Sequence, residues 1–176
     1  MRRHLVLLAL LPVLAVLNYS LYERETLRRG GELVLLELAP ADPRSLMQGD
    51  YMRLRYEAEQ KAGAAWKRLT EEEPDLETRG PTSRKIVLSL DDKARARFDR
   101  FHREGEVLAP QERLLSFRFL PDKGSSSIRI EPQSFFFQEG HGDQFSAARF
   151  GMMHLGSDGD HMLVGLANEA LAEIRP

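Results

Sequence analysis

Cysteine is missing from all 176 residues, so the chain can form neither a disulfide nor a thiolate nucleophile. The sequence also lacks a Walker A loop, a GxGxxG loop, a GxSxG elbow and an HExxH pair. These motifs are the most direct sequence signs of nucleotide binding, serine hydrolysis and zinc catalysis. We therefore expect no cofactor, and the sequence names no reaction.

An excess of basic residues is also missing. The totals are 25 basic and 27 acidic residues; removing the five arginines and two glutamates of residues 1–29 leaves 20 and 25 in residues 30–176, a net charge of −5 with histidine neutral. Nucleic-acid binding depends on a positive surface that neutralises phosphates. Nucleic acid is therefore not an expected partner.

Charge is absent from one long stretch near the N-terminus. Residues 5–22 read LVLLALLPVLAVLNYSLY, and Tyr19 and Tyr22 in this segment are residue types that favour a membrane interface. A helix of about 17–25 apolar residues spans a bilayer. We therefore predict a transmembrane helix within an anchor-and-linker region of residues 1–29, with the lipid bilayer as its partner.

A cleaved signal peptide is the alternative for this segment, but its one small-residue site, Val13-Leu14-Ala15, leaves a short hydrophobic region. Three arginines after the segment nearly balance the two before it, so the positive-inside count decides little. Because short N-terminal tails usually stay inside, we expect a single-pass protein of the inner (cytoplasmic) membrane. Its C-terminal domain would lie in the periplasm.

Residues 30–176 have the pattern of a single β-rich domain. Short apolar or alternating runs between turn residues predict strands at 33–38, 51–57, 85–90, 94–98, 115–120, 127–131, 133–138, 147–155 and 161–166. Turn sequences at 121–124 and 156–160 predict two hairpins. The expected fold is mainly β, a β-rich α+β domain built as a compact antiparallel barrel or sandwich with a short helical insertion.

Two segments of this domain predict helix. Ala58, Ala62 and Trp66 recur at four-residue spacing within 58–73, which is typical of a short amphipathic helix. We interpret residues 58–83 as a surface excursion between two strands. Residues 168–174 predict a closing helix with Asn168 as its cap.

Alternation predicts the faces of two strands. Met52, Leu54 and Tyr56 share one face of the strand at 51–57, so we expect Tyr56 in the core. The run Phe135-Phe136-Phe137 cannot share one face. We expect the two outer rings to point inward and Phe136 to be covered by another element.

Ionisable residues gather in two turn-rich regions. Asp50 stands at the entrance of a strand. We interpret its carboxylate as an acceptor of hydrogen bonds from nearby backbone N–H groups, and as a group with which Arg44 can form an ion pair, rather than as a catalytic group. Metal-ligand residue types occur later, at Glu139, His141, Asp143, His154, Asp158, Asp160 and His161. Their spacing matches no compact metal motif, so we predict no metal site.

The stretch GDYMRLRY at 49–56 resembles the pattern that names the GDYXXLXY family of uncharacterised bacterial membrane-anchored proteins. The resemblance extends to DPRSL at 42–46, FFFQEGHG at 135–142, ARFG at 148–151 and Gly165-Leu166. It implies an N-in, membrane-anchored protein without an assigned reaction, often encoded beside multi-span membrane proteins. It supplies no catalytic residues.

Two functions follow as hypotheses, with a small-ligand sensor as a third. The favoured one is a non-enzymatic, extracytoplasmic accessory or interaction module that works with an integral, multi-span membrane protein. Its expected contact residues are Asp42, Arg44, Gly49, Asp50, Tyr51, Tyr56, Glu139 and His141. The alternative is a hydrolase or metal-dependent enzyme, which requires Asp50, Glu139 and His141 to converge in one cleft.

Overall fold

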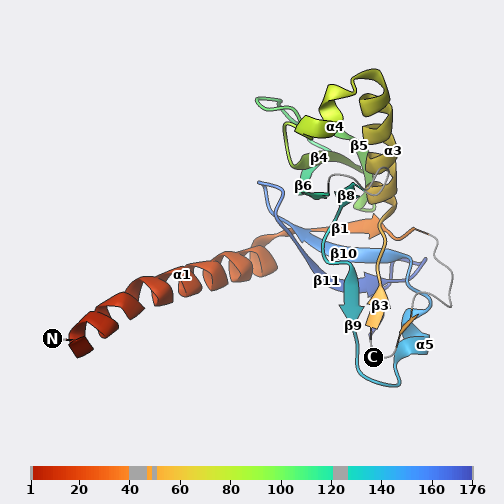
Figure 1. The fold of residues 1–176 in the computed structure, drawn as a ribbon. Coiled ribbons are helices and arrows are strands. Elements are labelled where there is room, and N and C mark those ends of the chain that lie inside the picture. The colour runs from red at the N-terminus through yellow and green to blue at the C-terminus, as the bar shows by residue number, and fades with distance from the viewer. Residues whose placement is uncertain (1, 40–46, 49–50, 121–126, 176) are drawn as a thin grey trace.

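A six-stranded sheet is the largest feature of the computed structural model, which describes residues 2–39, 47–48, 51–120 and 127–175. Its strand order is β11-β10-β1-β5-β4-β6 (Figure 1). The strands are β1 (Glu32–Glu37), β4 (Lys85–Leu90), β5 (Arg95–Phe101), β6 (Glu112–Ser116), β10 (Phe150–Leu155) and β11 (His161–Ala167). Neighbours are antiparallel, except that β1 and β5 run parallel.

The fold is mixed α/β, and of the two predicted architectures, an antiparallel barrel or sandwich, the closed barrel is wrong. Strands β11 and β6 end the sheet, and no ladder joins them within the strands that the structure describes. A parallel pair needs a long crossover, which usually contains a helix. Between β1 and β5 the chain forms helix α3 (Glu57–Glu72), which packs against β5.

Helix α3 confirms the helix predicted at 58–73 but not its interpretation as a surface excursion. Ala58, Ala62 and Trp66 are buried in the main core cluster. The Trp66 ring meets Phe101 and Phe119 edge-on, at centroid distances of 5.8 and 5.4 Å. Helix α4 (Asp75–Arg79) follows in part of the predicted loop. The amphipathic face of α3 therefore closes the core instead of lying outside it.

Two small sheets complete the domain. Strands β2 (Met47–Gln48), β3 (Tyr51–Arg53) and β9 (Ser134–Phe136) form one, and β7 (Arg118–Phe119) and β8 (Ile128–Arg129) form the other, which confirms the hairpin predicted there. The second predicted hairpin is confirmed as β10–β11. Strand β1 lies inside the six-stranded sheet, between β10 and β5. Its Val34, Leu35 and Leu36 are all buried, as expected of an interior strand with both faces covered.

The closing segment differs from its prediction. Residues 168–174 form a turn, in which the Ala172 N–H donates to the Asn168 side chain at 3.1 Å and the Ile174 N–H donates to the Leu166 carbonyl at 2.8 Å. Glu173 thereby bridges back to Ala167 at the end of β11. Asn168 stabilises this return of the chain rather than a helix. One short helix, α5 (Gly142–Phe145), was not predicted.

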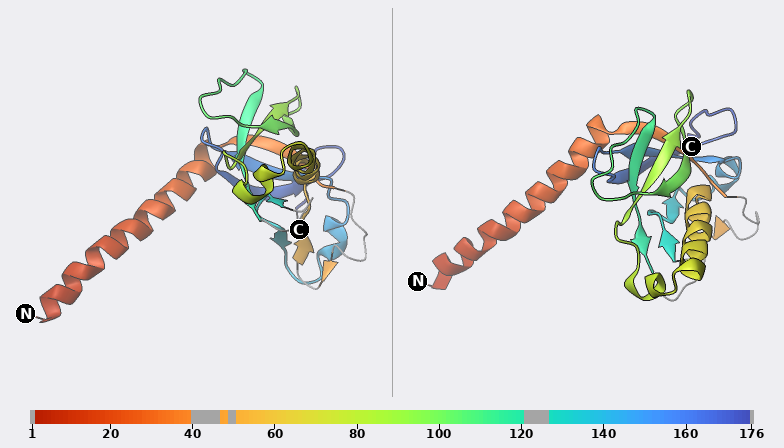
Figure 2. Two further views of the ribbon diagram at one scale, coloured as in Figure 1. Left: turned by 45° about the horizontal axis from the view of Figure 1, so that its top comes forward. Right: turned by 90° about the horizontal axis from the view of Figure 1, so that it is seen from above.

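Helix α1 (Arg2–Gly30) is continuous over 29 residues and projects away from the domain in every view (Figure 2). A Cβ at Gly31, where the helix meets the sheet, would lie 2.5 Å from the Leu27 carbonyl oxygen and 2.8 Å from the His154 Cβ, so only glycine fits. The large apolar side chains between Leu10 and Tyr22 are exposed. Among the residues that the structure describes, no helix has both the length and the apolar character needed to cross a membrane.

Candidate functional site

The strand that carries the GDY motif faces the core with alternate side chains, as predicted. Met52, Leu54 and Tyr56 are buried, whereas Arg53 and Arg55 are exposed. Strand β3 pairs with β9, and the Leu54 N–H extends this pairing by donating to the Gln133 carbonyl at 2.8 Å. The motif therefore fixes residues 133–136 against the core.

Tyr56 is fully buried and makes two distinct contacts. Its hydroxyl donates to the Pro132 carbonyl at 2.8 Å. Its ring packs on Gly151, where a Cβ would lie only 3.1 Å from the ring. Burial, with smaller effects from Glu59 and Glu131, raises the pKa of Tyr56. Tyr56 is therefore a neutral core residue. Because it is buried, its side chain is not available on the surface for the predicted contact with a partner protein.

Glu59 lies beside Tyr56 at the start of α3. Its carboxylate accepts the Ile130 N–H at 3.2 Å, and burial raises the pKa of this carboxyl. Arg129 donates to the Gln133 side chain nearby, while its buried Nε has no partner among the described residues. No sequence pattern singled out this cluster. The hydrogen bonds of this cluster hold β8 and residues 130–133 to α3.

Tyr51 and Phe136 face each other across the pair β3–β9 on the outer side of the small sheet. Their ring centroids are 5.7 Å apart, and 73% of Phe136 is exposed. Phe135 and Phe137 turn the other way and pack on Phe145 of α5, with ring centroids at 5.2 and 5.1 Å. The prediction that Phe136 would be covered is wrong, because β9 belongs to a small sheet whose outer face is open at this ring.

Glu139 and His141 follow β9 in a turn that Gly140 forms with a positive φ of 85°. The His141 N–H donates to the Gln138 carbonyl at 3.2 Å, and the Glu139 side chain is exposed. These two residues therefore lie at the end of the strand that carries Phe136. Four further predicted contact residues, Asp42, Arg44, Gly49 and Asp50, lie outside the described residues.

The residues of metal-ligand type do not form a common site. His161 binds the Glu131 carbonyl with Nε2 at 2.7 Å, and Asp158 accepts the Asp160 N–H at 3.1 Å in the hairpin turn. His154 lies on β10 with a buried Nδ1. In the described part of the chain, no three His, Asp or Glu side chains come together as metal ligands would.

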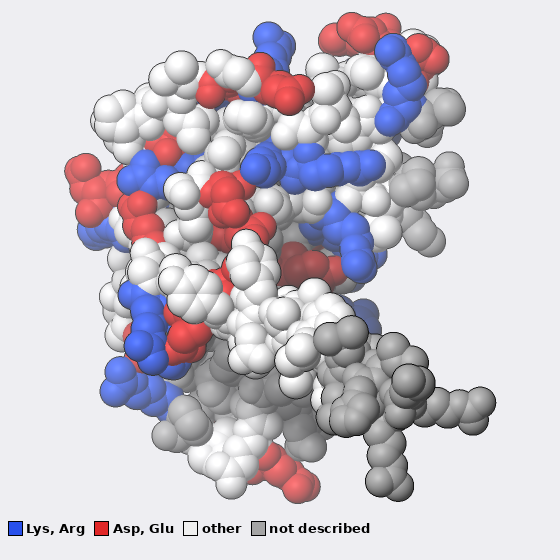
Figure 3. Space-filling view, turned by 90° about the vertical axis from the view of Figure 1, so that its left-hand side faces the viewer, with Lys and Arg blue, Asp and Glu red and all other residues white. Residues whose placement is uncertain are grey.

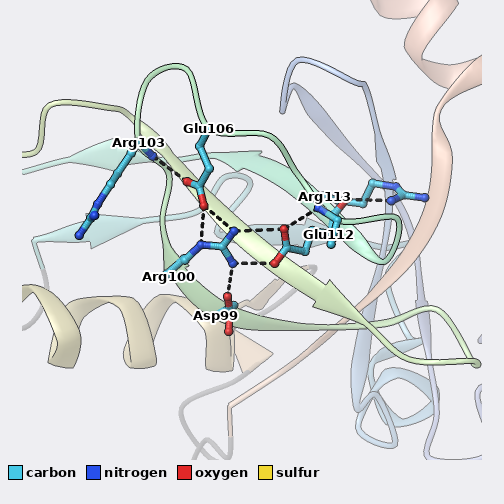
Figure 4. A network of polar contacts seen from close by, with 7 residues as sticks. Asp99, Arg100, Arg103, Glu106, Glu112 and Arg113 are labelled. Atoms are coloured by element: carbon cyan, nitrogen blue, oxygen red, sulfur yellow. Dashed lines mark hydrogen bonds and ion pairs between the residues drawn. The ribbon is translucent and has the colours of Figure 1, made fainter.

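An ion-pair cluster around Arg100 was not predicted. The Arg100 guanidinium on β5 binds Asp99, Glu106 and Glu112, with Glu112 of β6 contacted at 2.6 and 3.1 Å (Figure 4). These hydrogen bonds, with one from the Ala109 N–H, lower the pKa of Glu112 to about 2. The cluster fastens the loop 102–111 to β5 and β6. Glu106 and Glu112 lie six and twelve positions from Arg100, across a loop, so no helical or strand periodicity pairs them with it.

Among the residues that the structure describes, two surface grooves stand out. The first, about 830 Å³, lies between α3, α4 and β5 and is lined by Trp66, Leu69, Phe98, Phe101, His102 and Glu104 among others. The second, about 1030 Å³, lies where α1 meets the β10–β11 hairpin, and we call it the root groove. Glu139 and His141 line neither groove. The arrangement therefore gives no support to a catalytic cleft built on these two residues.

The face from which α1 projects carries basic and acidic side chains interspersed with each other (Figure 3). No large patch of one charge is seen among the side chains that this view describes. Non-specific attraction to a strongly charged partner is therefore not a property of this face.

Comparison with known proteins gives one match. A family model with the description "GDYXXLXY protein" matches residues 13–166, which include most of α1 and nearly all of the domain. Searches of curated proteins and of solved structures found no significant match.

Proposed function

The chain belongs to the GDYXXLXY family, and we propose that it is a membrane-anchored, extracytoplasmic interaction module that binds a multi-span integral membrane protein. In this proposal α1 is a single-pass anchor in the inner membrane, and the domain stands in the periplasm. The surface that binds the partner is centred on Tyr51 and Phe136. The observation that carries the proposal is the exposure of Phe136 beside the family motif.

The anchor is supported by the sequence of residues 5–22, which lacks charge, and by the shape of α1. Apolar side chains on all sides of a helix favour an apolar medium around it. From Leu10 to Tyr22 these side chains are exposed in the isolated chain. At about 1.5 Å per residue, an 18-residue helix extends about 27 Å, close to the thickness of a hydrocarbon core. Tyr19 and Tyr22 would then lie at the interface.

The contact surface is supported by the different exposure of the aromatic residues near the motif. Phe135 and Phe137 both pack on Phe145, and Tyr56 is buried, but Phe136 is 73% exposed. Exposed aromatic rings on a rigid element are the usual anchors of protein interfaces. Backbone pairing of β9 with β3 holds Phe136 in place, which reduces the entropy lost on binding.

Site-specific photocrosslinking in living cells tests this proposal. We expect a photoreactive residue at position 136 to crosslink to an integral membrane protein. The same residue at position 107 is the matched control, because Val107 is 90% exposed and lies in the distant loop 102–111. Equal crosslinking from both positions, or none from position 136, would contradict the proposed contact surface.

A further inference from the structure

The lining of the root groove has an apolar part and two flanking walls. Leu155, Met162, Leu163 and Pro132 are the apolar residues that line it away from α1, and we call them its apolar floor. One wall is the last part of α1, including Tyr22 and Leu27, and the other includes the hairpin turn. Gly156 of the turn lies close to α1, since a Cβ built at this glycine would be 3.4 Å from the Leu27 side chain.

Carboxylates dominate the rim of the root groove. Glu23, Glu131, Asp158 and Asp160 line it, against one cationic side chain, Arg24, so its lining has a net charge of −3 with His161 neutral. Among the ion pairs of the described residues, only Glu131 has a basic partner, Arg118 at 3.8 Å. The opposite ends of the rim, one on α1 and one on the hairpin, thus present negative charge above an apolar floor.

We propose that the root groove binds a basic, amphipathic segment of the integral membrane partner. This inference rests on the proposed function, since an anchor at residues 5–22 places the groove beside the membrane surface, where a segment leaving the bilayer can enter it. Charge complementarity selects the occupant: carboxylates attract lysine and arginine and repel anionic lipid headgroups. The apolar floor accepts the other face of the segment.

Binding of two synthetic peptides to the full chain in non-ionic detergent micelles tests the inference. One 14-residue peptide contains leucine and lysine at helical spacing, and the other has glutamate in place of lysine. We expect the protein to bind the lysine peptide above the level of empty micelles, and not the glutamate peptide. Raising the salt concentration should weaken the binding, because exposed charges are screened.

A pair of matched double variants locates the binding. Glu131→Gln with Asp160→Asn should weaken binding of the lysine peptide about three- to tenfold, as the loss of two exposed ion pairs does. Glu72→Gln with Glu104→Gln removes the same charge from the other groove and should leave the affinity unchanged. Equal weakening by both variants, equal binding of both peptides, or no binding above empty micelles would each overturn the inference.

The variant Phe136→Ala separates this inference from the proposed function. We expect it to bind the lysine peptide normally, because Phe136 does not line the root groove. If crosslinking from position 136 succeeds while the peptide result fails, only the groove assignment is wrong. If the peptide binds as expected and the crosslink is absent, the groove stands and the contact surface at Phe136 is wrong.

Discussion

Tyr56 makes two contacts that substitution can separate. Its ring fills the core over Gly151, and its hydroxyl satisfies the Pro132 carbonyl. We expect Tyr56→Ala to lower the free energy of unfolding by about 3–5 kcal/mol, because it removes a buried aromatic ring. Tyr56→Phe should cost about 1 kcal/mol, because it removes the hydrogen bond to the half-buried Pro132 carbonyl.

Denaturant unfolding of the detergent-solubilised chain measures both values. Trp66 is the single tryptophan, and it is buried beside the sheet, so its fluorescence reports on loss of the core. Phe136→Ala is the control, because an exposed ring should contribute less than about 1 kcal/mol. A change below about 1 kcal/mol for Tyr56→Ala would show that the strand does not face the core as described.

The residues of the motif also show what sequence reasoning can predict. Period-two alternation placed Met52, Leu54 and Tyr56 in the core, because that pattern is a property of any strand with one buried face. The same reasoning failed at Phe136. Whether its side of β9 is covered depends on which other segment packs there, and that is decided by tertiary contacts that no local pattern records.

At the scale of elements, the loop 102–111 depends on the Arg100 cluster. Hydrogen bonds from Arg100 and from the Ala109 N–H lower the pKa of Glu112 to about 2, so the folded state binds this proton more weakly than the unfolded state does. The stabilisation is therefore complete above the ordinary carboxyl pKa of about 4.3 and is lost as the pH falls toward 2. Arg100→Gln should raise the pKa of Glu112 toward its ordinary value.

An NMR titration of the Glu112 carboxyl carbon in the parent and in Arg100→Gln checks this expectation. The melting temperatures of the two proteins should differ most above about pH 5 and converge as the pH approaches 2. The double variant Glu72→Gln with Glu104→Gln serves as a control for general charge effects. A parent Glu112 that titrates near its ordinary value would contradict the cluster.

Elements with a strong local pattern were predicted well, and so were the two hairpins, but the pairing of strands distant in sequence was not. The apolar run of β1, the four-residue spacing of α3 and the turn of the β10–β11 hairpin all produce local signals. The parallel alignment of β1 with β5 produces none, because it depends on how α3 folds back over the sheet. The turn at 168–174 failed for a related reason: its backbone bonds reach back to β11 rather than forming a helix.

At the scale of the whole molecule, the direction of α1 decides which partners the domain can meet. The helix leaves the sheet beside the root groove, while Tyr51 and Phe136 lie on the small sheet (Figure 1). Anchored through residues 5–22, the chain would hold both surfaces on one side of the bilayer. An integral protein in the same membrane could then reach both surfaces. If the partner were soluble, the domain would not need an anchor in order to meet it.

The orientation of the chain is the last prediction. We expect a C-terminal fusion to a reporter that is active only after export to give signal, and a reporter active only in the cytoplasm to give none. The three arginines at 24, 28 and 29 argue weakly for the opposite orientation, but Arg28 and Arg29 both pair with Glu25. Because acidic residues contribute little to the positive-inside rule, these pairs do not remove that argument, and the fusion experiment decides between the two orientations.

Two other outcomes of the fusion experiment are informative. Signal from the cytoplasmic reporter alone would show that the arginines hold the domain inside, and the extracytoplasmic location would be wrong. Signal from the exported reporter, together with a soluble domain whose new N-terminus lies near Val16, would show that the segment is a cleaved signal peptide. In that case the α1 residues that line the root groove, from Ser20 onward, would remain, but the domain would diffuse freely and would have to find its partner without an anchor.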